Sequence, residues 1–198
     1  LKTRTGHMPY QQAIKIILPV ARALAFAHQN EIIHRDVKPA NILITKDGIP
    51  VLSDFGIAKI IESEDSTQLT STGVGIGTPE YMAPEQWEGH AVPQSDIYAL
   101  GVILYELITG RKPYMAETPA AIHRMMLTEP LPRPRNYAPD MPEELERVLF
   151  KALAKSTADR YPTMDAFISS LEKIATLSPQ PTQVGETLSV RGDKKPAA

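Results

Sequence analysis

The chain has 198 residues, of which 42% are hydrophobic and 22% are charged, and it carries a net charge of −2. This composition is typical of one globular domain with its own core. Near-neutral charge without a long basic run argues against nucleic-acid binding, and the absence of cysteine excludes disulfides and thiolate metal sites. The longest apolar run, residues 97–108, is shorter than the roughly 20 residues of a membrane span, so no membrane contact is expected within this chain.

Apolar residues recur at helical spacing between residues 8 and 29, which predicts the first helix. They are Ile14, Ile17, Leu18, Ala21, Leu24 and Ala25. Pro9 suits the first turn of such a helix, because its missing N–H would be unpaired there in any case. Pro19 lies in the helix interior, where its ring removes a hydrogen bond, so a kink or a local break is expected there.

Residues 42–54 predict a β-hairpin, because two short runs of branched apolar residues flank the turn dipeptide Asp47-Gly48. If these two residues form the loop, the register outward from it places Asn41 opposite Asp54. Directly opposed residues have Cβ atoms about 4.5–5.5 Å apart. Local geometry alone would therefore bring an amide oxygen and a carboxylate together.

The next segment, residues 56–85, is rich in Ser, Thr and Gly and lacks periodicity, which predicts a long and partly mobile loop. The apolar run that follows predicts a buried helix with Ser95 as its N-cap and Gly110 at its end. Five prolines between residues 129 and 142 favour a rigid surface connection over a ligand for a proline-recognition domain.

Two amphipathic helices are predicted over residues 142–154 and 163–175. After these helices the chain is dominated by Ser, Pro, Gln, Thr and Gly, which is typical of a disordered linker. The sequence therefore predicts a folded unit over residues 1–176 and a linker over residues 177–198.

A cluster of charged and polar residues, "HRDVKPAN" at 34–41, lies between two apolar runs. Burying unpaired charge is costly, so the cluster indicates a functional site. Oxygen ligands from Asn41 and Asp54 suit a hard cation, and Mg²⁺ usually binds one or two carboxylates together with substrate phosphates. Lys38 supplies a positive charge for an anionic substrate, and Asp36 could accept a proton. A metal, a cation and a carboxylate base are the requirements of phosphoryl transfer.

The motif "HRDVKPAN" resembles the catalytic loop of eukaryotic-type (Hanks-type) protein kinases. "DFG" at 54–56 and "APE" at 83–85 are similar to the metal-binding motif and the third signature of that family, in the expected order. "GTPEYMAPE" and "SDIYALGVILYELITGRKPY" extend the resemblance, which covers residues 1–176 and is similar in style to bacterial members. It implies a mainly α (α+β) fold: a kinase C-terminal lobe, built as a helical bundle around a buried central helix, with a small β-hairpin at the catalytic loop.

The resemblance implies a serine/threonine protein kinase that uses ATP and Mg²⁺, with Mn²⁺ as an alternative metal. Asp36 would be the catalytic base, and Lys38 would contact the γ-phosphate. Asn41 and Asp54 would hold the metal, and Leu43 would pack under the adenine. Protein substrates with Ser or Thr acceptors would be its partners, because Lys38 and "GTPEY" resemble Ser/Thr rather than Tyr specificity.

The same resemblance implies two further functional roles. Thr78 would line the site beside the acceptor residue. Arg35 would pair with a phosphorylated residue in the loop that follows Asp54, because phosphate adds charge that an arginine can bind. The candidates are Thr70 and Thr72, with Ser66, Thr67 and Ser71 also available.

Three residues resemble structural elements of the family. Asp96 would hold the backbone of the catalytic loop from below. Glu85 and Arg160 would form a buried ion pair that ties the end of the loop to a later helix. His34 and Phe55 are interpreted as core residues rather than as participants in the chemistry.

The family also requires an N-terminal lobe with a Gly-rich loop, a strand lysine and a helix glutamate. "QAIKII" at 12–17 resembles the strand motif but lies in a helical pattern, and "GVGIG" at 73–77 lacks the last glycine of a Gly-rich loop. The N-terminal lobe is therefore interpreted as absent from residues 1–198, and as a missing partner from the same, longer protein. The chain alone is expected to fold, to be inactive, and to self-associate through its uncovered lobe surface.

Two alternative functions stay open at this point. A pseudokinase or scaffold would share the fold, although here the four residues of the phosphoryl-transfer cluster are all intact. A small-molecule phosphotransferase of kinase-like fold would lack a peptide-docking segment such as "GTPEYMAPE". The absence of a signal-peptide pattern favours a cytoplasmic location, either free or as the cytoplasmic part of a membrane-anchored kinase.

Overall fold

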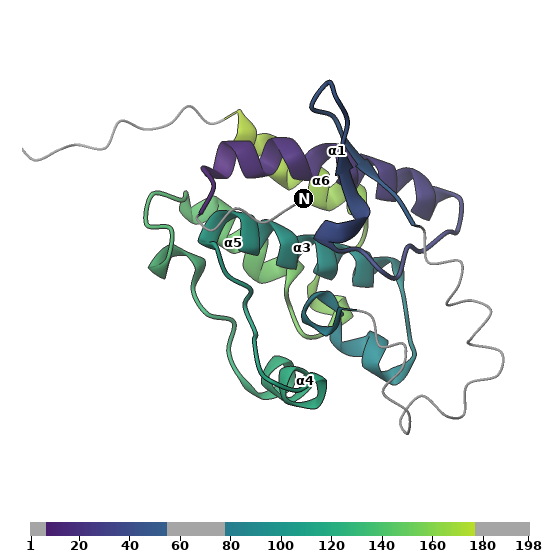
Figure 1. The fold of residues 1–198 in the computed structure, drawn as a ribbon, viewed down its shortest axis with the longest axis vertical. Coiled ribbons are helices and arrows are strands. Elements are labelled where there is room, and N and C mark those ends of the chain that lie inside the picture. Colours follow the sequence, from purple (N-terminus) through teal and green to yellow (C-terminus); the bar gives the residue numbers. More distant parts are fainter. Residues whose placement is uncertain (1–6, 55–77, 177–198) are drawn as a thin grey trace, which may run out of the picture.

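The structure is a computed structural model, and it describes residues 7–54 and 78–176. This part of the chain is mainly helical, with one small antiparallel sheet (Figure 1). The helices and strands are, in chain order, α1 (Tyr10–Gln29), β1 (Ile42–Ile44), β2 (Pro50–Leu52), α3 (Pro93–Thr109), α4 (Pro119–Thr128), α5 (Glu143–Ala152) and α6 (Met164–Ala175). The predicted mainly helical fold with a small β-hairpin is confirmed.

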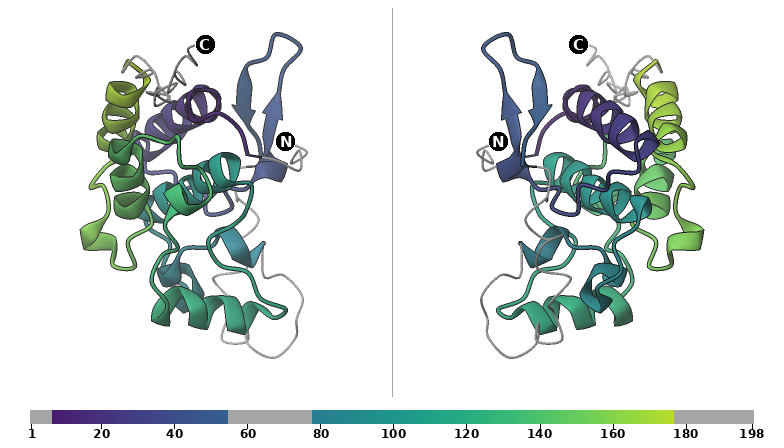
Figure 2. Two further views of the ribbon diagram at one scale, coloured as in Figure 1. Left: turned by 90° about the vertical axis from the view of Figure 1, so that its left-hand side faces the viewer. Right: turned by 90° about the vertical axis from the view of Figure 1, so that its right-hand side faces the viewer.

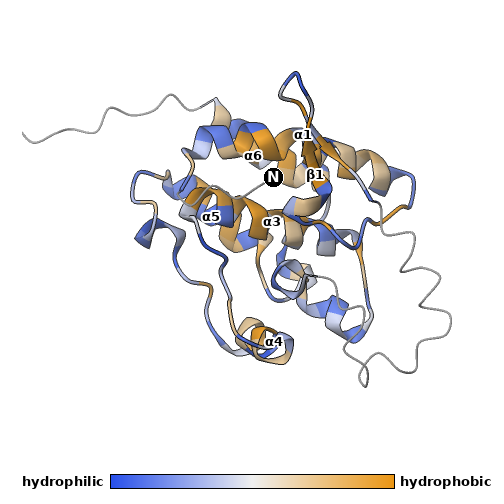
Figure 3. Ribbon diagram, in the orientation of Figure 1, coloured by the Kyte–Doolittle hydropathy of each residue, from blue (hydrophilic) through white to orange (hydrophobic). Residues whose placement is uncertain are grey.

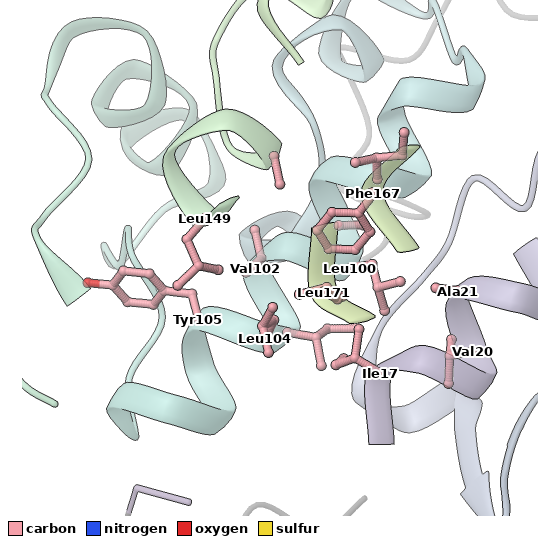
Figure 4. Close-up of a cluster of buried hydrophobic side chains, with 14 of the residues drawn as sticks. Ile17, Val20, Ala21, Leu100, Val102, Leu104, Tyr105, Leu149, Phe167 and Leu171 are labelled. Atoms are coloured by element: carbon pink, nitrogen blue, oxygen red, sulfur yellow. The ribbon is translucent and has the colours of Figure 1, made fainter. Parts of the chain in front are cut away.

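Helix α3 is the centre of the core. Nearly all of its side chains are buried, and α1, α5 and α6 each pack against it. Figure 3 shows α3 as the hydrophobic helix that runs through the middle of the molecule. Figure 4 shows Leu100 and Leu104 of α3 gathered with Ile17 of α1 and Leu171 of α6. Each such buried aliphatic side chain contributes about 1.5–3 kcal/mol to folding, so this contact is a main source of stability.

The β-hairpin and helix α4 lie at opposite ends of the molecule. The β1–β2 hairpin projects from the helical body beside α1, and α4 lies at the opposite end (Figure 2). Helix α4 was not predicted from the sequence, because its only buried apolar side chains are Ile122 and Met126, which form a small separate cluster with Tyr114. The segment that carries the charged cluster runs between these two ends.

Helix α1 continues through Pro19 as one helix, so of the predicted kink or local break, the break is wrong. A proline in a helix interior costs about 3 kcal/mol. The fully buried side chains of Ile14, Ile17, Val20 and Leu24 flank it on the face that packs on α3 and α6. Their combined burial outweighs the cost of the lost hydrogen bond.

The hairpin has a register one residue away from the prediction. Leu43 pairs with Val51, and the loop has three residues, since the Thr45 N–H donates to the Ile49 carbonyl at 2.9 Å. Gly48 adopts φ 79°, the left-handed conformation that ends a three-residue loop.

The residue opposite Asn41 is consequently Ser53, whose N–H donates to the Asn41 carbonyl at 2.9 Å, and the predicted opposition of Asn41 and Asp54 is wrong. Asp54 follows directly after that pair and has φ 56°, so the chain leaves the ladder at this residue. The dipeptide Asp-Gly fits both loop lengths, which is why sequence alone selected the shorter one.

The boundaries of α3 correct one prediction and confirm another. The helix begins at Pro93, so Ser95 is its third residue rather than its N-cap. The Ser95 hydroxyl instead accepts a hydrogen bond from the Val92 N–H at 3.1 Å, which caps the helix from inside its first turn. Gly110 ends the helix with φ 74°, as predicted.

The two amphipathic helices are confirmed as α5 and α6. The proline-rich segment forms the predicted connection between α4 and α5, with one 3₁₀ turn at Pro134–Asn136. The predictions of a mobile loop after Asp54 and of a linker over residues 177–198 fall largely or wholly outside the described residues. Among the helices of residues 7–54 and 78–176, none is long and apolar enough to cross a membrane.

Candidate active site

The segment 34–41 brings Asp36, Lys38 and Asn41 into direct contact. The Lys38 ammonium lies 2.8 Å from Oδ2 of Asp36, and each of these side chains is only about one-fifth exposed. The Asn41 amide nitrogen donates to the Asp36 carbonyl at 2.8 Å and lies 3.3 Å from its Oδ2. A carboxylate, a cation and an amide thus converge as the sequence cluster indicated.

Asn41 and Asp54 are joined through Ser53 rather than by direct pairing. The Ser53 hydroxyl lies 3.2 Å from the Asn41 carbonyl and 3.1 Å from Oδ2 of Asp54, so it bridges the end of the hairpin. Because its nitrogen is held by Asp36, the Asn41 amide can offer its Oδ1 as a ligand. An amide oxygen and a carboxylate at the same end of the hairpin form a set of oxygen ligands that suits Mg²⁺.

A metal at this position would need ligands beyond the protein. In the part of the chain that the structure describes, no three His, Cys, Asp or Glu side chains gather into a metal-binding group. Mg²⁺ normally completes its octahedral shell with substrate phosphates and water. The pair formed by Asn41 and Asp54 therefore fits a metal that arrives with a phosphorylated substrate.

Asp96 lies below the segment that leads into Asp36 and binds its backbone. Its Oδ2 accepts from the His34 N–H at 2.9 Å, and its Oδ1 accepts from the Arg35 N–H at 2.9 Å. The residue is 1% exposed. Arg35 has φ 67°, a left-handed conformation that costs a non-glycine residue about 1–3 kcal/mol. The two charge-assisted bonds to Asp96 offset this strain.

Two histidines support this anchor. The ring Nε2 of His28 in α1 lies 2.7 Å from Oδ2 of Asp96, a contact that sequence analysis missed. His34 is fully buried, as predicted, but it is also hydrogen-bonded at both ring nitrogens. Its Nδ1 accepts from the Asp36 N–H at 3.3 Å, so Nε2 carries the proton and donates to the Ser53 carbonyl at 3.0 Å.

A small pocket lies between the catalytic loop and the segment Thr78–Ala83. Arg35, Asp36, Thr78 and Met82 are among the residues that line it. The predicted substrate-side residue Thr78 thus shares a pocket wall with Asp36. By contrast, Leu43 lies on the outer face of the hairpin, where it is 54% exposed.

The segment that carries Thr78 is fixed to the helical body by two contacts. The Tyr81 hydroxyl donates to Glu106 of α3 at 2.5 Å, and Lys112 pairs with Glu80 at 3.0 Å. Burial, reinforced by the hydrogen bond to Glu106, raises the pKa of Tyr81 well above its ordinary value. Tyr81 therefore stays a neutral donor, and the segment keeps its position beside the pocket.

Glu85 and Arg160, which the family resemblance paired, lie in direct contact as an ion pair. The guanidinium donates to both carboxylate oxygens, at 2.7 and 2.8 Å, and the Arg160 side chain is fully buried. The Ser95 hydroxyl donates a third bond to Glu85 at 2.6 Å. Burial raises the pKa of Glu85, but the bonds from Arg160 and Ser95 outweigh burial and leave it below its ordinary value.

Several predicted residues lie outside the described part of the chain, namely Phe55, Thr70 and Thr72. Within the described part, Nε of Arg35 is buried and has no hydrogen-bond partner. Gln86, which sequence analysis did not identify, donates to the Arg35 carbonyl at 2.9 Å. This contact spans 51 residues of sequence, so no local pattern could have revealed it.

Comparison with known proteins supports the family assignment made from the motifs. A family model described as "Protein kinase domain" matches residues 1–170. The chain is 42% identical to "Serine/threonine-protein kinase PknB" of Mycobacterium leprae over 176 residues, which cover 88% of this chain and 28% of the relative. It is 39% identical to "Serine/threonine-protein kinase PknL" of Mycobacterium tuberculosis over 171 residues, which cover 86% of this chain and 42% of the relative.

A third relative carries a different name. The chain is 42% identical to "Tyrosine-protein kinase MasK" of Myxococcus xanthus over 175 residues, which cover 84% of this chain and 27% of the relative. The chain thus spans well under half the length of each of these bacterial relatives. The ordered motifs, the geometry of the charged cluster and the family match lead to one conclusion: the chain belongs to the protein kinase domain family.

Proposed function

We propose that this chain is the C-terminal lobe of a serine/threonine protein kinase, and that the longer protein transfers the γ-phosphoryl group of ATP to Ser or Thr of protein substrates. The observation that carries the proposal is the contact of Lys38 and Asn41 with Asp36 at one loop. This arrangement supplies a carboxylate base and a cation within hydrogen-bond distance of each other. It meets the positional requirements of phosphoryl transfer.

In this proposal Asp36 accepts the proton of the substrate hydroxyl. The hydroxyl oxygen forms a bond to the γ-phosphorus, the bond from the γ-phosphorus to the bridging oxygen of ADP breaks, and ADP leaves with that electron pair. Lys38 lies 2.8 Å from Asp36, so one ammonium can both orient the carboxylate and face the negative charge of the transferred group. Asn41 keeps the loop compact by binding the Asp36 carbonyl.

Asn41 and Asp54 are the proposed metal ligands. A bound Mg²⁺ or Mn²⁺ would neutralise phosphate charge as it develops. The hydroxyl of Ser53 donates a hydrogen bond to the neighbouring Asp54 carboxylate and so holds it in place. Thr78 is the proposed neighbour of the acceptor residue, because it lines the same pocket as Asp36.

The outer face of the hairpin is the proposed contact surface for an N-terminal lobe of the same protein. Its exposed apolar side chains are Leu43, Ile49 and Val51. In that position Leu43 would pack under the adenine. If the lobe is missing, the same surface can associate with a second copy of the chain, since exposed apolar patches favour association.

Radiolabelled phosphate transfer by the longer protein tests this function. We expect Asp36→Asn to lower turnover by about 10²–10⁴-fold, the usual contribution of one proton-transfer group. Asp47→Asn is the matched control, because Asp47 is exposed in the hairpin loop. Near-wild-type turnover of Asp36→Asn would reject Asp36 as the base.

Analysis of the phosphorylated amino acids separates the remaining candidates. Phosphoserine and phosphothreonine are the expected products. Phosphotyrosine would place the chain with the activity in the name of its relative MasK. Transfer only to small molecules, or no transfer by wild type, would support the phosphotransferase and pseudokinase alternatives respectively.

A further inference from the structure

Gln86 is unusual in using both ends of its side-chain amide on backbone groups of different segments. It lies in a 3₁₀ turn, Pro84–Glu88, just after the "APE" motif. Its Nε2 donates to the Arg35 carbonyl at 2.9 Å, and its Oε1 accepts from the Ala83 N–H at 3.0 Å. Because one partner can only accept and the other can only donate, the two contacts define the orientation of the amide.

The contact with Arg35 holds the peptide that leads into Asp36. Arg35 is in the left-handed conformation, with φ 67°, and its N–H is bound by Asp96 at 2.9 Å. On the far side of the residue, the carbonyl of the Arg35–Asp36 peptide is bound by Gln86, and the N–H of that peptide is bound by His34 at 3.3 Å. The Gln86 bond is the shorter of these two, so it restrains the peptide that leads into Asp36, in addition to the contacts that Lys38 and Asn41 make with Asp36 itself.

The contact with Ala83 reaches the segment that contributes Thr78, Tyr81 and Met82 to the same pocket. Ala83 is fully buried and ends the segment that begins at Thr78. Arg35, Asp36, Thr78 and Gln86 all line this pocket. A single rigid amide therefore spans from the catalytic loop to the segment proposed to bind the substrate, and it sets the spacing between them.

A plain capping role would not explain this arrangement. Gln86 is the third residue of its turn, and its Oε1 caps the turn by binding the N–H of Ala83. Glu serves in that capping position as well as Gln does. Only the contact with the Arg35 carbonyl requires an amide at residue 86, because a carboxylate would face that carbonyl with negative charge and no donor.

We propose that Gln86 is a positioning residue for phosphoryl transfer: its amide holds the Arg35 carbonyl and so orients Asp36 relative to the substrate segment. The inference rests on the proposed function, in which Asp36 is the catalytic base. Reacting atoms must lie within about 3–3.5 Å of each other, and misplacement by about 1 Å can lower the rate by about 10²-fold.

Gln86→Glu is the decisive variant, because it keeps the cap and replaces the donor to the Arg35 carbonyl with a charged acceptor. In the longer protein we expect kcat to fall by about 10–100-fold, with the KM for ATP and the melting temperature near wild type. Gln94→Glu is the matched control, since the Gln94 amide donates to the Pro162 carbonyl at 3.0 Å, away from the pocket. Its kcat should equal that of wild type.

A spectroscopic measurement on the 198-residue chain tests the contact without any assay of activity. In Gln86→Glu the NMR carbonyl shift of Arg35, read through the Asp36 amide, should move, whereas the Ala83 amide should keep its slow hydrogen exchange. Gln94→Glu should leave both signals unchanged. An unmoved Arg35 carbonyl shift would overturn the proposal.

The outcomes separate this inference from the function on which it rests. Wild-type kcat in folded Gln86→Glu, together with an inactive Asp36→Asn, would overturn the role of Gln86 alone. An active Asp36→Asn would instead overturn the proposed function. If Gln86→Glu does not fold, Gln86→Met replaces it, because the methionine side chain has the same length as glutamine and no charge. The kcat of Gln86→Met should also fall. A wild-type kcat in this variant would reject the proposal.

Discussion

Arg160 binds both carboxylate oxygens of Glu85 across 75 residues of sequence, at 2.7 and 2.8 Å. The same guanidinium also donates to the carbonyls of Ala154, Lys155 and Gln94. Arg160 thus joins the end of the "APE" segment, the first turn of α3 and the chain that follows α5. This one buried group thereby fixes the end of the segment that lines the pocket, in addition to the contacts of Tyr81 with Glu106 and of Glu80 with Lys112.

Loss of Arg160 should therefore unfold the protein rather than impair chemistry alone. Breaking a buried ion pair costs about 3–5 kcal/mol, because the remaining charge stays without compensation. We expect Arg160→Met to lower the free energy of unfolding by about this amount in urea titrations. Arg22→Met is the matched control, since its pair with Glu172 is exposed, at 59% and 46%, and such pairs contribute about 0–1 kcal/mol. Equal effects of the two substitutions would contradict the structural role of Arg160.

Glu85 should also make stability depend on pH. Its pKa in the folded protein is lower than the ordinary value of 4.5, so its contribution to stability is complete above pH 4.5 and is lost as pH falls through the lower, folded pKa. Wild type should consequently lose more stability than Glu85→Gln between pH 4.5 and the acid limit of folding. Urea unfolding of both proteins across that range measures the difference. Parallel pH curves for the two would show that Glu85 has an ordinary pKa.

Activation by phosphorylation is expected at Thr70 or Thr72. Arg35 directly precedes the proposed base and has a buried Nε without a partner among the described residues, so it can bind a phosphate on the following loop. Mass spectrometry of active longer protein should find phosphate at one of these threonines, and the double change to alanine should lower activity. The double alanine variant of Ser66 and Thr67 tests two of the other available hydroxyls in parallel, and it should keep its activity if Thr70 or Thr72 is the site. A fully active Thr70→Ala/Thr72→Ala variant would reject both sites.

The 198-residue chain alone should bind MgATP weakly and should not phosphorylate proteins. Leu43 is 54% exposed, so one face of an adenine placed on it would stay in water. A metal held by the proposed ligands Asn41 and Asp54 would depend on the phosphates to complete its shell. Isothermal titration calorimetry tests this expectation: low-micromolar affinity, or measurable transfer to a protein substrate, would show that the chain is sufficient by itself.

Sequence alone predicted the features whose causes lie within a short stretch of chain. The catalytic cluster was recognisable because Asp36, Lys38 and Asn41 fall within six residues, and the structure places them in contact. The central helix was predictable because its apolar residues are continuous. Glu85 and Arg160 are distant in sequence and were paired only through the family resemblance, since nothing local in either stretch points to the other.

The tertiary structure decided everything that depends on the balance between distant groups. Asp-Gly fits loops of two or three residues, and only the packing of the hairpin placed Ser53 rather than Asp54 opposite Asn41. Helix α1 runs through Pro19 because burial of its apolar face outweighs the lost hydrogen bond. His28 and Gln86 could not be identified in advance, because their partners lie 68 and 51 residues away. Short stretches of sequence predict the local elements and show which chemical groups they carry, whereas the energy of packing determines which distant groups come into contact.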